Sequence, residues 1–156
     1  MPLKIHVSSD LHLEFDANAA PEFPEEADVI ILAGDIWLAD DVPDYVIRVA
    51  TDHPNAHVIL VLGNHEYYYQ NYHDVLPSIK STLAAVSNAS VLENESIIIN
   101  DVLFLGCTLW TGFDAVPGVS PTTGKRDAEV NVYDFHIIKN GNVVILPFLA
   151  DAQSRS

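Results

Sequence analysis

The 156-residue chain carries 22 Asp and Glu against 7 Lys and Arg, which gives a formal net charge of −15. This charge would repel the phosphates of DNA or RNA over any surface without bound cations, so nucleic-acid binding is disfavoured. A hydrophobic share of 49% allows one domain with a sizeable core. The single cysteine excludes an internal disulfide framework, and no apolar stretch approaches the roughly 20 residues that span a bilayer. We therefore expect a cytoplasmic protein with no membrane segment.

Three short apolar runs, residues 3–9, 28–34 and 57–63, are rich in Val, Ile and Leu. Such runs suit strands that are buried on both faces of a parallel sheet. Segment 42–53 lies between the second and third runs, and apolar residues recur at helical spacing in segment 72–88. Alternating strands and helices predict right-handed βαβ crossovers and an α/β fold.

The helix expected within 72–88 has a candidate cap at Asp74, or at a neighbouring residue, and Pro77 fits its first turn. Beyond it, residues 90–110 form short apolar runs joined by polar turns at 93–95 and 100–101. This spacing leaves no room for a helix and predicts an antiparallel meander or hairpin.

Residues 111–129 are rich in Gly, Pro, Ser and Thr, which predicts a long loop. Segment 130–148 places two apolar stretches around residues 140–142, Asn-Gly-Asn, which is a strong signal for a β-hairpin. The last residues, 149–156, are expected to start a helix or to fray.

Residues able to bind metals follow each of the three apolar runs. Asp10 and His12 follow the first, Asp35 the second, and Asn64 and His65 the third. The carboxyl ends of parallel strands meet at one edge of a sheet, so these side chains are expected to converge. Carboxylate, imidazole and amide ligands suit cations such as Mn²⁺, Fe²⁺ or Zn²⁺. Two such ions about 3.5–4 Å apart clamp a phosphate and activate a water molecule.

Each of these residues also has a simpler explanation when it is taken alone. Asp35 is compatible with a helix N-cap, and Asn64 with an ordinary turn. We assign His6, His53 and His57 to packing or solvent, because none stands at the carboxyl end of a strand. The coincidence of all three strand-end groups is what favours a metal site.

The three groups resemble the signature of the calcineurin-like metallophosphoesterases, which is D-x-H, then G-D, then G-N-H-[DE]. In this chain they stand at residues 10–12, 34–35 and 63–66, and segment 91–113 is similar to the one that follows in a group of bacterial members. The resemblance implies a β-sandwich flanked by helices. It also implies that Asp10, His12 and Asp35 hold a first metal ion, and that Asp35 and Asn64 hold a second. His65 would then serve the phosphate or the leaving group.

The chain departs from that family pattern downstream of the third motif. The family's later ligands are histidines in G-H and G-H-x-H elements, whereas the later histidines here are His73, in the expected helix, and His136, in an expected strand. Neither follows a glycine. We therefore expect residues 1–156 to form a single, C-terminally truncated domain in which the second metal site binds its ion weakly or stays empty.

A second departure concerns the residue that orients His65. Many family members carry an Asp three residues after the G-D aspartate, and this chain has Leu38 there. Glu66, Asp40 and Asp41 are the substitutes considered from the sequence.

Two functions remain open. One is a metal-dependent phosphoesterase that hydrolyses a small phosphomonoester or phosphodiester through a metal-bound hydroxide. The alternative is a non-catalytic scaffold or truncated remnant that acts through protein association, with a homodimer formed through the incomplete second sheet.

Overall fold

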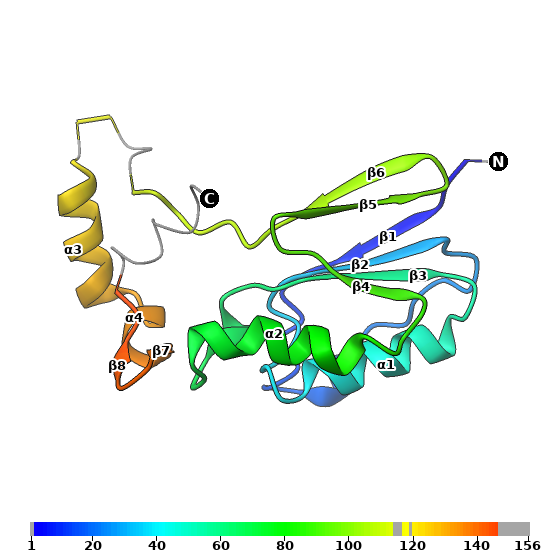
Figure 1. Ribbon diagram of the computed structural model, residues 1–156, viewed down its shortest axis with the longest axis horizontal. Coiled ribbons are helices and arrows are strands. Elements are labelled where there is room, and N and C mark those ends of the chain that lie inside the picture. Colours follow the sequence, from blue (N-terminus) through cyan, green and yellow to red (C-terminus); the bar gives the residue numbers. More distant parts are fainter. Residues whose placement is uncertain (1, 114–116, 119, 147–156) are drawn as a thin grey trace.

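The structure is a computed structural model that describes residues 2–113, 117–118 and 120–146 (Figure 1). Its centre is a four-stranded parallel sheet in the order β1-β2-β3-β4. The strands are β1 (Ile5–Ser8), β2 (Val29–Ala33), β3 (His57–Val61) and β4 (Ala89–Val91). The three apolar runs thus form strands as expected. The beginning of segment 90–110 differs from the prediction, because β4 joins the parallel sheet instead of an antiparallel meander.

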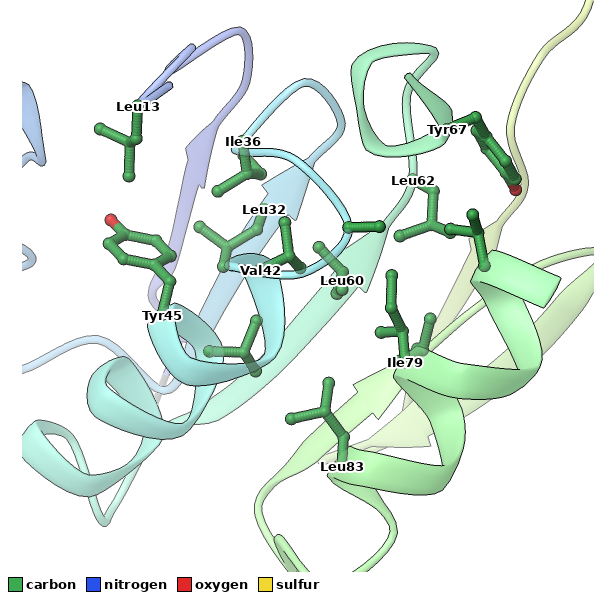
Figure 2. Packing of buried hydrophobic residues seen from close by; sticks show 14 of the residues in the cluster. Leu13, Leu32, Ile36, Val42, Tyr45, Leu60, Leu62, Tyr67, Ile79 and Leu83 are labelled. Carbon is green, nitrogen blue, oxygen red and sulfur yellow. The ribbon is translucent and has the colours of Figure 1, made fainter. Parts of the chain in front are cut away.

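Two helices, α1 (Val42–Asp52) and α2 (Tyr72–Leu83), cover one face of this sheet (Figure 1). Their apolar residues pack on alternate residues of β2 and β3 to form the main core, which Figure 2 shows around Leu32 and Leu60. Helix α2 begins earlier than predicted, because the backbone amide of Asp74 already donates to the carbonyl of Asn71. Pro77 consequently lies inside the helix rather than in its first turn.

A hairpin of β5 (Glu95–Ile99) and β6 (Val102–Gly106) lies over the face of the sheet opposite to the helices (Figure 1). Its turn residues Asn100 and Asp101 have φ values of 48° and 64°, as a tight type I′ connection requires. The inward face of the hairpin packs on the other face of β2 and β3 in a small second core. The predicted hairpin is therefore confirmed and supplies a second layer of strands.

The predicted loop over residues 111–129 is wrong in its second half, because α3 (Pro121–Asn131) is helical. The Ser120 side chain accepts a hydrogen bond from the Thr123 amide and caps this helix. The prediction of a strand around His136 is also wrong, because these residues form the short helix α4 (Asp134–Ile137). Local apolar content did not distinguish a strand from a short helix that buries Phe135.

The hairpin predicted around residues 140–142 is present but short, with β7 (Lys139–Asn140) paired to β8 (Val143–Val144). Two 3₁₀ turns complete the elements, η1 (Ala17–Ala19) and η2 (His65–Tyr67). Residues 149–156 lie outside the described part of the chain. None of the helices in the described ranges is long and apolar enough to span a membrane. The α/β class expected from the sequence is confirmed.

Candidate metal centre

The loops that follow β1, β2 and β3 meet at the carboxyl edge of the sheet, and backbone hydrogen bonds join the first two. The amide of Asp10 donates to the carbonyl of Gly34 at 3.0 Å, and the amide of His12 donates to that of Asp35 at 3.0 Å. The loop after β1 therefore continues alongside the loop after β2. This arrangement brings the first two motifs together, as the strand order predicts.

The second and third motifs touch through their glycines. A Cβ atom on Gly34 would lie 2.9 Å from the Gly63 nitrogen, and one on Gly63 would lie 2.6 Å from the Asp35 nitrogen. Gly34 also has a φ of 87°, which side chains rarely tolerate. The two glycines thus let the ends of β2 and β3 approach more closely than any larger residue would allow.

Three of the residues predicted as metal ligands adopt a left-handed backbone conformation. The φ values are 54° at Asp10, 47° at His12 and 53° at Asp35. Such conformations cost on the order of 1 kcal/mol or more each for residues other than glycine, and they concentrate at functional sites. The strain supports a functional rather than a structural role for these loops.

The structure brings His12, Asp35 and His65 together, with one potential ligand atom from each lying within 4.8 Å of the others. The His12 and His65 rings lie 4.3 Å apart between centroids. Asp35 receives a further hydrogen bond from the backbone amide of His65, at 2.9 Å to its Oδ1. One residue from each motif therefore contributes to a compact set of two imidazoles and one carboxylate.

Two predicted ligands lie outside this set of three. Asp10 has a side chain that is 68% exposed, and its Oδ1 lies 3.9 Å from the Nε2 of His12. It borders the set without joining it. Asn64 lies on another side, where its Nδ2 donates to the Tyr68 hydroxyl at 3.0 Å and to the Asp134 carboxylate at 2.8 Å.

Glu14 is a member of the site that sequence reasoning missed. Its Oε1 lies 2.7 Å from the Nδ1 of His65 and 3.2 Å from the Nδ1 of His12. Burial raises the pKa of Glu14, but hydrogen bonds from its own amide, His65 and His12 outweigh burial, so this pKa lies below its ordinary value. An ionised carboxylate can only accept hydrogen bonds, so each ring has to turn an Nδ1–H group to Glu14, which leaves its Nε2 facing away.

Glu66 has a different role from the one considered for it. Its carboxylate is fully buried and accepts hydrogen bonds from the backbone amides of Gly63, Ile36 and Asp35, at 2.7, 2.8 and 3.1 Å. Burial raises the pKa of Glu66 above its ordinary value, against the lowering effect of the Ile36 and Gly63 amides. Glu66 therefore joins the second and third motifs through their backbones and does not orient His65.

The other residues considered from the sequence lie elsewhere. Asp40 accepts a hydrogen bond from Gln70 at 3.1 Å, and Asp41 is the N-cap residue of α1, so Glu14 takes the place proposed for them. The remaining histidines lie outside the cluster: His6 contacts Ser8, His57 contacts Ser90, His53 packs on Phe23, and His73 and His136 are exposed.

A cavity of about 420 Å³ opens beside this cluster on the Asn64 side. Its lining comes from Ala33 and residues 61–64 at the ends of β2 and β3, from residues 107–111, which follow β6, and from Asp134. Its volume lies in the range of small-molecule sites, about 300–1,000 Å³. Asn64, which precedes His65 in the chain, and Asp134 thus line a hollow of substrate size.

A sequence profile of calcineurin-like phosphoesterases matches residues 3–144. The chain belongs to this family. An uncharacterised protein of Acanthamoeba polyphaga mimivirus is 26% identical over 149 residues, which cover 84% of this chain and 50% of the viral protein. The chain therefore spans about half the length of this curated relative.

Members of the calcineurin-like phosphoesterase family bind divalent metal ions, and the site fits such an ion chemically. Two imidazoles and a carboxylate are ligands suited to borderline cations. The Glu14 carboxylate behind the His12 ring has the form of the outer partner that orients a metal-binding histidine, and it contacts the His65 ring as well. The sequence pointed to His12, Asp35 and His65 directly, but it gave no sign that one acid contacts both rings.

The buried Glu66 carboxylate leads to a stability prediction. Glu66→Gln replaces an acceptor by an amide NH₂ that faces backbone donors, so at least one buried N–H loses its partner. We expect the free energy of unfolding to fall by about 1–3 kcal/mol. Urea unfolding followed by circular dichroism measures the change. Glu26→Gln, at an exposed residue, should stay within about 0.5 kcal/mol of the wild type. Equal midpoints for both variants would contradict the assigned role.

The Glu14 contacts lead to a prediction about ring protonation. In the metal-free protein at pH 8, His12 and His65 should both carry the proton on Nδ1, because Glu14 accepts from that atom. Nitrogen NMR of the imidazole rings distinguishes the two tautomers. Glu14→Ala should mix the tautomers in both rings, whereas Glu22→Ala, at an exposed residue, should leave them unchanged. Nε2–H rings in the wild type would rule out the proposed orientation.

Proposed function

We propose that this chain is the metal-binding part of a phosphoesterase that hydrolyses a small phosphomonoester or phosphodiester. The observation that carries the proposal is the convergence of His12, Asp35 and His65, one residue from each of three strand ends. Family membership supports the same chemistry. A bound divalent cation would supply charge neutralisation for the phosphate and would lower the pKa of a water molecule.

The first ion would be held by Asp10, His12 and Asp35. His12 turns its Nδ1 to Glu14 and its Nε2 toward Asp10, so the free nitrogen and the exposed carboxylate face the same space. The side-chain oxygens of Asp35 and Asn64 would face a second ion. Mn²⁺, Fe²⁺ and Zn²⁺ all match these donors, and the first site should bind its ion more tightly than the second because it has the larger number of protein ligands.

His65 would act on the leaving group. Its Nδ1 contacts the Glu14 carboxylate and its ring lies 4.1 Å from the Tyr68 ring, so the imidazole is fixed between the two. In its protonated form, Nε2 would donate a proton to the departing alkoxide, and Glu14 would stabilise the positive ring. Glu14 would thus orient His65, a role that the apolar side chain of Leu38 cannot fill.

The neighbouring cavity supports a small substrate. It holds about 420 Å³ and is bordered by Asn64, so a phosphate near the cluster would leave room there for the organic part of an ester. The net charge of −15 opposes binding of extended nucleic acids. A cytoplasmic setting agrees with the single cysteine of the chain.

The activity is tested with p-nitrophenyl phosphate and bis-p-nitrophenyl phosphate in the presence of Mn²⁺. We expect turnover that EDTA abolishes. His65→Ala should lower kcat by about 10²–10⁴-fold, the usual contribution of a general acid. His73→Ala serves as the matched control, because His73 is exposed on α2. Absence of turnover with Mn²⁺, Fe²⁺ and Zn²⁺ at micromolar protein would refute the activity of this chain.

A second candidate function, association through an incomplete second layer of strands, rests on exposed apolar surface. On the outward face of the β5–β6 hairpin, Ile98, Leu103 and Leu105 are 69%, 56% and 78% exposed. On β1, Ile5 and Val7 pair with Val29 and Ile31, which face the second core, yet the hairpin leaves both β1 residues exposed. Exposed apolar side chains gathered on strand faces mark association sites when they form a patch.

A homodimer formed through this surface should have twice the mass of the monomer in light scattering during size-exclusion chromatography. Leu103→Glu should dissociate it, because the charge falls on the outward face of the hairpin. Leu109→Glu adds the same charge at a residue that is 88% exposed outside the hairpin, and it should leave the dimer intact. A strictly monomeric wild type at 100 µM would count against association.

A further inference from the structure

Asn64 takes part in a closed network of three side chains on the cavity side of the cluster. Its Nδ2 lies 2.8 Å from the Oδ1 of Asp134 and 3.0 Å from the hydroxyl of Tyr68. The same hydroxyl donates to the Oδ1 of Asp134 at 2.7 Å. The three polar groups are therefore all within hydrogen-bonding distance of one another.

The carboxylate of Asp134 determines which group donates and which accepts in each hydrogen bond of this network. An ionised carboxylate only accepts hydrogen bonds, so the amide of Asn64 must turn its nitrogen toward Asp134. The reverse orientation would place two oxygens 2.8 Å apart. The hydroxyl proton of Tyr68 also goes to Asp134, which leaves the hydroxyl oxygen to accept from Asn64. Both contacts are made by the amide nitrogen, and the carbonyl oxygen of Asn64 is directed away from them.

Packing of the C-terminal elements places Asp134 in this position. Asp134 begins α4, whose next residue, Phe135, is buried in the main core and lies 6.5 Å from the ring of Phe113. After α4, the amide of Lys139 donates to the carbonyl of Gln70 at 2.9 Å. The segment carrying Asp134 is therefore bonded to the loop that directly follows Tyr68. The packing of α4 and the Lys139–Gln70 hydrogen bond therefore hold both Asp134 and Tyr68 in place.

We propose that Asp134 and Tyr68 are positioning residues that fix the Asn64 amide with its carbonyl oxygen presented to a second divalent cation. The inference rests on the proposed function, since it needs a cation at the adjacent cluster. An amide without such partners would present its oxygen or its NH₂ group with little preference, and only the oxygen binds a cation. Outer partners of this kind typically change metal affinity by about 10–100-fold.

The test is a calorimetric titration of the metal-free protein with Mn²⁺, with the number of bound ions checked by electron paramagnetic resonance. The wild type should bind two ions. Asp134→Asn replaces a carboxylate that can only accept hydrogen bonds by an amide that can also donate, and Tyr68→Phe removes the second contact while keeping the carboxylate. Each variant should weaken the second binding event by about 10–100-fold and leave the first unchanged.

Asp127→Asn is the matched control, because it makes the same chemical change at an exposed position of α3 and should preserve both binding events. Thermal unfolding of each variant shows whether the fold is retained. The side-chain NH₂ resonances of Asn64 in the metal-free protein provide a readout independent of binding. They should shift in Asp134→Asn and Tyr68→Phe but not in Asp127→Asn.

Two results would overturn this inference while leaving the proposed function intact. One is a wild type that binds a single Mn²⁺ ion. The other is an Asp134→Asn variant with both events at wild-type affinity. A wild type that binds no Mn²⁺ would instead refute the proposed function itself, and the inference with it.

Discussion

The buried carboxylate of Glu66 is the constraint on which the rest of the site depends. It accepts hydrogen bonds from backbone amides in the loops after β2 and β3, which come from motifs about thirty residues apart. A buried carboxylate is costly without such partners, and buried amides are costly without an acceptor, so each group requires the other. With these loops joined, Gly34 and Gly63 touch and Asp35 is held beside His65.

Around this fixed backbone, side chains are oriented by acceptors that cannot also donate. Glu14 does this for His12 and His65, and Asp134 does it for the Asn64 amide. In both cases a carboxylate decides which atom of an ambivalent group faces inward and which is left for a ligand. The acidic character of the chain is thus partly explained by acids that position other residues, although most of its acids lie on the surface.

The two layers of the fold differ in completeness. The helix side of the sheet is closed by α1 and α2, and its core is continuous. Within the described part of the chain, the β5–β6 hairpin covers the other side, its inward residues meet Val29 and Ile59, and Ile5 and Val7 on β1 stay exposed. The C-terminal elements pack at the end of the main core rather than over this face, and through Asp134 they reach the site.

The sequence by itself determined three of the four parallel strands, both crossover helices, the tight hairpin after Ile99 and the meeting of three motifs at one edge. These features follow from local periodicity and from the geometry of parallel sheets. It did not determine α3, α4, or the roles of Glu14, Glu66 and Asp134. Apolar residues in a short segment fit a strand or a helix equally well, and the choice is made by what they pack against. A carboxylate likewise has no role until a partner is near, and Asn64 meets Asp134 across 70 residues only because the tertiary structure brings them together.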